Sequence, residues 1–192
     1  VPAVGTPVTF AEGVTGPEGI AFEPGGGLIV GTATGQVLRF KPNASRTVLA
    51  ELGEPLAGIT VLRDGRVLAA SFGPGRVWVV DPGEAQPRVL ASGVPGANFI
   101  VETRRHRILA SASSAGTIVD VTSGTPVERA SGLSFPNGLA LGPGHFLYVA
   151  QTLMSNVVRL PLASDGTLGA AQPYATGVLA ADGIGFDRVG NL

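Results

Sequence analysis

Hydrophobic residues along this chain fall into short clusters that are bounded by glycine, proline and charged residues. The clusters are too short for ordinary helices, and many are rich in Val, Ile, Leu and Phe, which favours β-strands. The first part of the pattern predicts four successive strands, at residues 20–22, 28–31, 36–40 and 47–50. A turn such as Glu23-Pro24-Gly25, between the first two, is typical of antiparallel hairpins.

The same pattern returns with a period of about forty residues. Each copy opens with one residue, which we call the anchor, followed by a phrase close to Gly-Ile-Ala-Phe. The anchors lie 39, 41, 39 and 45 residues apart, at Glu18, Ala57, Asn98, Asn137 and Asp182. In the fourth copy the predicted strands are residues 139–141, 146–150, 156–161 and 172–175. A four-stranded repeat of this length indicates the blades of a β-propeller.

We therefore predict an all-β fold in which residues 1–192 form a single β-propeller domain. The chain carries four full copies and the start of a fifth, which ends where its second strand should begin, at Gly190-Asn191-Leu192. Residues 7–10 match a fourth strand, and we expect them to pair with the last blade of a closed ring. On this interpretation the chain is truncated, because a ring of five or six blades needs tens of further residues.

Composition supports this fold and excludes several function classes. The 29 glycines and 15 prolines suit many short strands, and 44% hydrophobic residues suffice for a core. No apolar run approaches the roughly 18 residues of a membrane helix, so we expect a soluble protein with no membrane partner. Its net charge of -1 and scattered basic residues give no surface for nucleic acid. Because the chain has no cysteine, the sequence does not decide between the bacterial cytoplasm, the periplasm and secretion. It does not decide the oligomeric state either.

Four of the five anchors carry oxygen-bearing side chains: Glu18, Asn98, Asn137 and Asp182. The first strand of every propeller blade lines the central channel, so we expect equivalent positions to converge there. Two carboxylates and two amide oxygens suit a hard cation such as Ca²⁺ better than zinc. Ala57 leaves a gap in this set. The alternative is that each polar anchor only satisfies backbone groups in its turn.

Three phrases carry a resemblance to a known family: Gly16-Pro17-Glu18-Gly19, Phe135-Pro136-Asn137-Gly138-Leu139-Ala140 and Ala181-Asp182-Gly183-Ile184. With them the whole chain resembles the six-bladed propellers of the gluconolactonase, regucalcin and luciferin-regenerating family. More distant relatives are diisopropyl fluorophosphatase, paraoxonase and strictosidine-synthase-like proteins. The resemblance implies a complete ring of six blades and a catalytic divalent cation, commonly calcium. It assigns the cation to Glu18, Asn98, Asn137 and Asp182.

The resemblance also implies an activity, the metal-dependent hydrolysis of lactones or related esters, with a small molecule as substrate. Asp182 is then the candidate general base or nucleophile as well as a metal ligand. The second strands end on the same face as the anchors, so we predict substrate contacts from Phe72, Gln151 and Thr152. The two histidines, His106 and His145, lie in hairpins at the opposite end of the blades.

Two other functions remain open. The first is a non-enzymatic propeller that binds a protein or carbohydrate through one face. The second is a strictosidine-synthase-like scaffold that works without a metal. A structural cation could still bind in the first, whereas the four oxygen-bearing anchors argue against the second.

Overall fold

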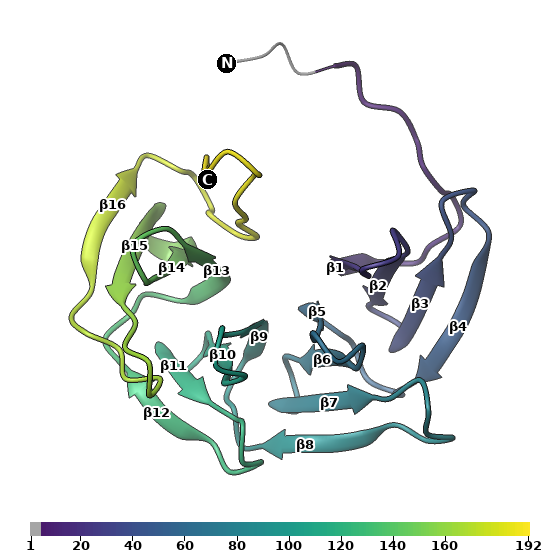
Figure 1. Ribbon diagram of the computed structural model, residues 1–192, viewed down its shortest axis with the longest axis horizontal. Helices are drawn as coiled ribbons and strands as arrows, with labels where there is room; N and C mark the ends of the chain where they lie inside the picture. The colour runs from purple at the N-terminus through teal and green to yellow at the C-terminus, as the bar shows by residue number, and fades with distance from the viewer. Residues whose placement is uncertain (1–4) are drawn as a thin grey trace.

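The structure, a computed structural model, describes residues 5–192 and consists of four antiparallel four-stranded sheets arranged in an arc (Figure 1). The first sheet contains β1 (Pro17–Phe22), β2 (Leu28–Thr32), β3 (Gln36–Phe40) and β4 (Arg46–Glu51). The second contains β5 (Ile59–Val61), β6 (Val67–Ser71), β7 (Arg76–Val80) and β8 (Arg88–Ser92). The third contains β9 (Ala97–Glu102), β10 (Ile108–Ala112), β11 (Thr117–Asp120) and β12 (Val127–Ala130). The fourth contains β13 (Pro136–Gly142), β14 (Phe146–Gln151), β15 (Asn156–Pro161) and β16 (Gln172–Thr176).

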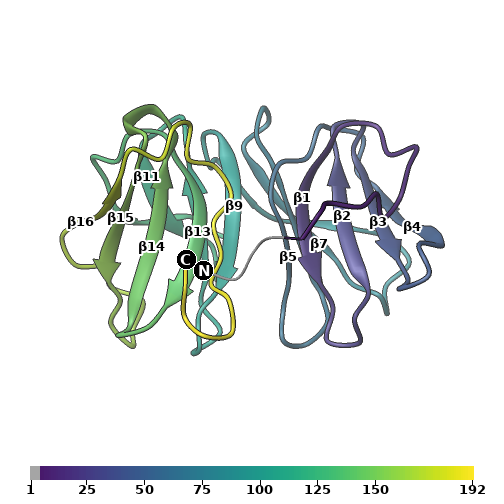
Figure 2. The same ribbon diagram turned by 90° about the horizontal axis from the view of Figure 1, so that it is seen from above.

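The predicted propeller blades are confirmed. Within each sheet the strands follow chain order, and β1, β5, β9 and β13 lie toward the centre of the arc (Figure 1). Viewed from above, the strands run between two faces of the molecule (Figure 2). We call the face where the inner strands begin the anchor face, and the face where they turn back the hairpin face.

The core lies between neighbouring sheets rather than inside any one of them. Fully buried pairs fill each of the three interfaces: Ile29 and Ile59, Leu68 and Ile100, and Leu109 and Leu139. All five residues of β6 and all five of β10 are buried, because a neighbouring sheet covers each face of these strands. This explains why the second strands are apolar at successive positions rather than alternating.

A buried carboxylate in β11 joins that strand to β12 and to the hairpin before β10 in the third sheet. The side chain of Asp120 is 4% exposed and accepts hydrogen bonds from Arg107 Nη1 at 2.9 Å and Arg129 Nη2 at 3.0 Å. The hydroxyl of Thr122 also donates to it, at 2.5 Å. Burial by itself would raise the pKa of Asp120, but the hydrogen bonds from Thr122, Arg129 and Arg107 outweigh it and hold that pKa below its ordinary value.

Two segments differ from the prediction. Residues 7–10 form no strand, because a strand needs a hydrogen-bonded neighbour and no part of residues 5–192 pairs with this segment. Phe10 instead packs edge to face on Phe40, with ring centroids 6.1 Å apart. The fifth copy likewise has no assigned strand, although its hairpin turn forms through a hydrogen bond from Asp187 N–H to Asn191 O at 2.9 Å.

The only helical element in residues 5–192 is a single 3₁₀ turn, η1 (Thr152–Met154). No helix in this described range is long and apolar enough to cross a membrane.

Candidate metal and substrate site

Three of the four polar anchors lie inside β-bulges. The pairing between first and second strands shifts by one residue between Pro17 and Ile20, and between Pro136 and Leu139. The same shift occurs around Asn98, where Ala110 and Ala112 pair with Ile100 and Ala97. A bulge leaves one extra residue unpaired and redirects its side chain, which is a common device beside functional sites.

Glu18, Asn98 and Asp182 line one cavity of about 510 Å³ at the hub of the arc. They come from three separate copies of the repeat, and Ala57 of the second copy lies in the same wall. Glu18 and Asp182 are exposed, whereas Asn98 is half-buried. The fourth predicted ligand, Asn137, is buried and does not line this cavity. The structure therefore brings three of the four predicted ligands to one place.

In copies two and four the backbone is hydrogen-bonded to the anchor of the next copy. Gly58 N–H donates to the carbonyl oxygen of Asn98 at 2.8 Å, and Gly138 N–H donates to that of Asp182 at 3.1 Å. A Cβ at either glycine would lie less than 3.0 Å from that oxygen, so only glycine permits this approach. The glycine that follows an anchor thus sets the spacing of the hub.

The third and fourth sheets are joined differently, because Phe99 replaces the glycine in copy three. The hydroxyl of Ser111 accepts a hydrogen bond from Phe99 N–H at 2.9 Å and donates to Asn137 O at 2.8 Å. A side-chain hydroxyl thereby completes the contact between neighbouring copies.

Both asparagine anchors are held through their amide nitrogens. Asn98 Nδ2 donates to Ser113 Oγ at 3.2 Å, and that hydroxyl donates to the carbonyl of Pro136 at 2.6 Å. Asn137 Nδ2 donates to Thr152 Oγ1 at 3.3 Å, and Thr152 donates to the carbonyl of Ala181 at 2.8 Å. In both cases the donor side of the amide is occupied, which leaves the acceptor oxygen for another partner.

Asn137 Oδ1 is one of the few buried side-chain atoms without a hydrogen-bond partner in residues 5–192. A buried oxygen without a hydrogen bond lowers the stability of the folded protein unless a water, an ion or a ligand binds to it. A divalent cation would do so, because neutral amide oxygens are good ligands for hard cations. The donor set therefore fits a calcium-like ion, although Asn137 is set back from the open cavity.

Histidine, cysteine and acidic residues alone do not form a metal site in the described part of the chain. No three such side chains gather closely enough to hold a metal ion there. The predicted set contains only two carboxylates, so it depends on the amide oxygens of Asn98 and Asn137.

Ser113 and Thr152 each support an asparagine anchor, a role that the sequence prediction did not include, and the predicted contact of Thr152 with substrate stays a prediction. Each follows its asparagine by 15 residues, and this equal spacing was the signal that could have identified them. Thr152, predicted to contact substrate, uses its hydroxyl to position Asn137.

The other two predicted substrate residues also lie outside the lining of the hub cavity. Gln151 is 7% exposed, and its amide is bonded to Ser134 N–H at 2.7 Å and to Asn156 Oδ1 at 2.9 Å. Phe72 lies at the end of β6 and packs against Phe135, with ring centroids 6.0 Å apart. A direct contact of Gln151 or Phe72 with substrate stays a prediction.

Comparison with protein families gives one match, the strictosidine synthase-like N-terminal model, over residues 9–40. No curated protein sequence matches the chain significantly. The family match includes Glu18 and its preceding phrase, which belong to the first copy of the repeat.

Solved structures share the fold. A gluconolactonase from Xanthomonas campestris has a TM-score of 0.77 at 22% identity, over 92% of this chain and 68% of its own length. The luciferin-regenerating enzyme has a TM-score of 0.75 at 15% identity, over 93% and 68%. Virginiamycin B lyase from Staphylococcus aureus has a TM-score of 0.75 at 16% identity, over 92% and 61%, so the chain spans less than two thirds of that protein. The resemblance predicted from the sequence is confirmed for the fold.

Proposed function

We propose that this protein is a metal-dependent hydrolase of lactones or related esters, with a divalent cation, most readily Ca²⁺, at the hub of the propeller. The observation that carries the proposal is the meeting of Glu18, Asn98 and Asp182 on one cavity, with the buried and unpartnered oxygen of Asn137 behind them. The gluconolactonase with the same fold supports the choice of lactones as the substrate class.

Glu18 and Asp182 would supply the negative charge of the site, and Asn98 and Asn137 would supply neutral oxygens. Oxygen ligands without thiolate or imidazole favour calcium or a similar hard cation over zinc. Four protein ligands leave room for water and substrate, since calcium takes six to eight oxygens.

When bound, the cation would polarise the carbonyl or phosphoryl oxygen of the substrate as a Lewis acid. Asp182 would accept a proton from the water that attacks the acyl carbon, and would return that proton to the leaving oxygen. Glu18 would take no part in the proton transfer and would serve as a ligand of the cation. Ser113 and Thr152 would keep the two amide oxygens aimed at the hub, because their hydroxyls occupy the amide nitrogens.

The direct test is a panel of lactones, aryl esters and phosphotriesters assayed with and without a chelator, together with metal analysis of the purified protein. We expect turnover that the chelator abolishes and that added Ca²⁺ restores. Asp182→Asn should keep the ligand shape and lose at least about 100-fold in kcat, which is a usual effect of removing a general base. Asp165→Asn is the matched control, because Asp165 is exposed in a loop on the hairpin face. Full activity in Asp182→Asn would remove Asp182 from this role.

A strictosidine-synthase-like function without a metal is the second candidate, and the family match over residues 9–40 favours it. It predicts turnover that a chelator leaves unchanged. A non-enzymatic binder would instead hold metal and hydrolyse nothing in the panel. The same assay therefore separates the three functions.

A further inference from the structure

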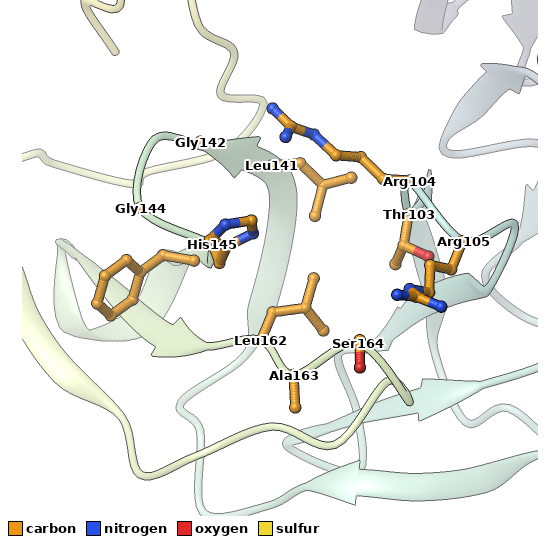
Figure 3. Close-up of a pocket in the computed structure, with 11 residues that line it drawn as sticks. Thr103, Arg104, Arg105, Leu141, Gly142, Gly144, His145, Leu162, Ala163 and Ser164 are labelled. Carbon is orange, nitrogen blue, oxygen red and sulfur yellow. The ribbon is translucent and has the colours of Figure 1, made fainter.

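A second cavity lies on the hairpin face, at the opposite end of the blades from the anchors. It has a volume of about 540 Å³, within the range of small-molecule sites. Its wall comes from the first hairpins of the third and fourth sheets and from the loop that follows β15 (Figure 3). None of the residues that line it belongs to the proposed metal site.

The titratable residues in this wall are all basic: Arg104, Arg105 and His145. No carboxylate lines the cavity. Six other arginines form ion pairs with carboxylates, whereas the side chains of these three have no such partner in residues 5–192. The wall therefore carries basic groups without an ion-pair partner, and such a lining favours an anion.

Two acidic residues are next in sequence to lining residues without lining the cavity themselves: Asp165, whose carboxylate accepts the backbone N–H of Thr167 at 2.9 Å, and Glu102, which is already engaged. One of its oxygens lies 2.6 Å from His106 Nδ1, and the other accepts the backbone N–H of Arg63 at 2.8 Å. Glu102 does not line the cavity. Both carboxylate oxygens of Glu102 therefore have partners that do not line the cavity.

The backbone at His145 is in an uncommon conformation for a residue with a side chain. His145 has φ of 59°, as does His106 in the first hairpin of copy three, whereas the first hairpins of copies one and two place Gly26 and Gly65 at positive φ. Glycine adopts this conformation without steric cost and histidine does not. Figure 3 shows the imidazole of His145 on one side of the cavity and the guanidinium of Arg105 on the other.

Apolar side chains complete the wall between His145 and Arg105. Leu141 and Leu162 lie between His145 and Arg105 in Figure 3. The loop that carries Leu162 is attached to the hairpin, because Leu162 N–H donates to His145 O at 2.8 Å. Phe146, also in the wall, is held by the guanidinium of Arg159, 4.6 Å from its ring centroid.

We propose that this cavity binds a small organic oxyanion, a carboxylate or phosphate monoester with an apolar body. Arg105 holds the anionic group, since guanidinium groups match carboxylate and phosphate oxygens in geometry and charge. Arg104 and His145 lie on other sides of the cavity and complete its basic lining. Leu141, Leu162 and Phe146 contact the apolar body. The site is independent of the metal and of the proposed hydrolysis.

The first test uses the two histidines of the chain as internal probes. Phenyl phosphate, benzoate and inorganic phosphate are titrated into the full chain, and the imidazole proton resonances are followed by NMR, with His145→Gln to assign them. We expect saturable shifts of His145, small shifts of His106, and tighter binding of phenyl phosphate than of inorganic phosphate. Equal and non-saturating shifts of both histidines would overturn the proposal.

The second test compares charge variants by calorimetry with phenyl phosphate. Arg105→Gln should weaken binding at least about tenfold, which is the order expected for a lost charged hydrogen bond. Lys41→Gln is the matched control, because it removes one positive charge from a turn in the first sheet and should bind as the wild type does. Equal affinity in both variants would overturn the proposal. Binding should persist in chelator and in Asp182→Asn, so its failure is distinct from failure of the proposed hydrolase.

Discussion

The substitution Gly58→Ala, which adds a single methyl group, should disrupt the packing of the inner strands at the hub. Gly58 N–H donates to Asn98 O at 2.8 Å, and a Cβ at this position would lie less than 3.0 Å from the same oxygen. That oxygen belongs to the backbone of the neighbouring sheet, so it cannot rotate away as a flexible side chain could. The inner strands of the second and third sheets must therefore move apart.

The magnitude follows from two terms. Forcing an extra methyl group into a packed interior costs about 1–3 kcal/mol, and the lost hydrogen bond costs about 0.5–1.5 kcal/mol. We expect the free energy of unfolding to fall by about 2–4 kcal/mol. For a chain of this size that corresponds to a drop in Tm of roughly 4–16 °C.

Thermal and urea unfolding, followed by circular dichroism, measure this loss. Gly25→Ala is the matched control, because a Cβ at Gly25 meets nothing within 4 Å and Gly25 does not have a positive φ. It should change stability by less than about 1 kcal/mol. If Gly58→Ala unfolds at the same temperature as Gly25→Ala, the glycine does not set the spacing of the hub.

Three further predictions concern the interior and the support of the site. Asp120→Asn should lower the free energy of unfolding at pH 7, measured in urea titrations, by about 2–3 kcal/mol. Because the pKa of Asp120 is lower in the folded protein, its contribution to stability is complete above about pH 4 and is lost as pH falls further. A difference between wild type and variant that stays constant down to about pH 2 would contradict this. Leu109→Ala, at a fully buried position between the third and fourth sheets, should cost about 2–5 kcal/mol, whereas Val89→Ala at a 39% exposed position should cost under about 1 kcal/mol. Thr152→Val keeps the shape but removes the hydroxyl that holds Asn137, so calorimetry should give about 10- to 100-fold weaker Ca²⁺ binding; unchanged affinity would make Thr152 irrelevant to the site.

The repeat made most of the fold predictable. Short apolar clusters at a forty-residue period gave the strands of all four sheets, and predicted bounds such as 36–40 and 156–161 agree with β3 and β15. Radial symmetry then implied that anchors far apart in the chain meet, and Glu18, Asn98 and Asp182 do line one cavity. Periodicity is a strong signal because each copy repeats the same evidence.

The rest depends on contacts between copies that periodicity alone does not reveal. Segment 7–10 has the composition of a strand, but a strand also requires a hydrogen-bonded partner, and none is present in residues 5–192. The depth of Asn137 behind the cavity could not be predicted from the repeat, because Asn98 has the same bulge and the same kind of bond to a hydroxyl and yet lines the cavity. The basic cavity on the hairpin face combines a hairpin of one sheet with a loop of the next, and these lie about forty to sixty residues apart without matching sequence.

Calorimetric titration of Ca²⁺ into the metal-stripped chain tests the central claim most directly, that oxygen ligands from separate copies of the repeat form one cation site. We predict one saturable site per chain, with binding at least about tenfold weaker in Glu18→Gln, because a carboxylate ligand is lost. Glu128→Gln, on the exposed outer strand β12, should bind as the wild type does. Absence of saturable binding, or equal affinity in Glu18→Gln and Glu128→Gln, would contradict the claim.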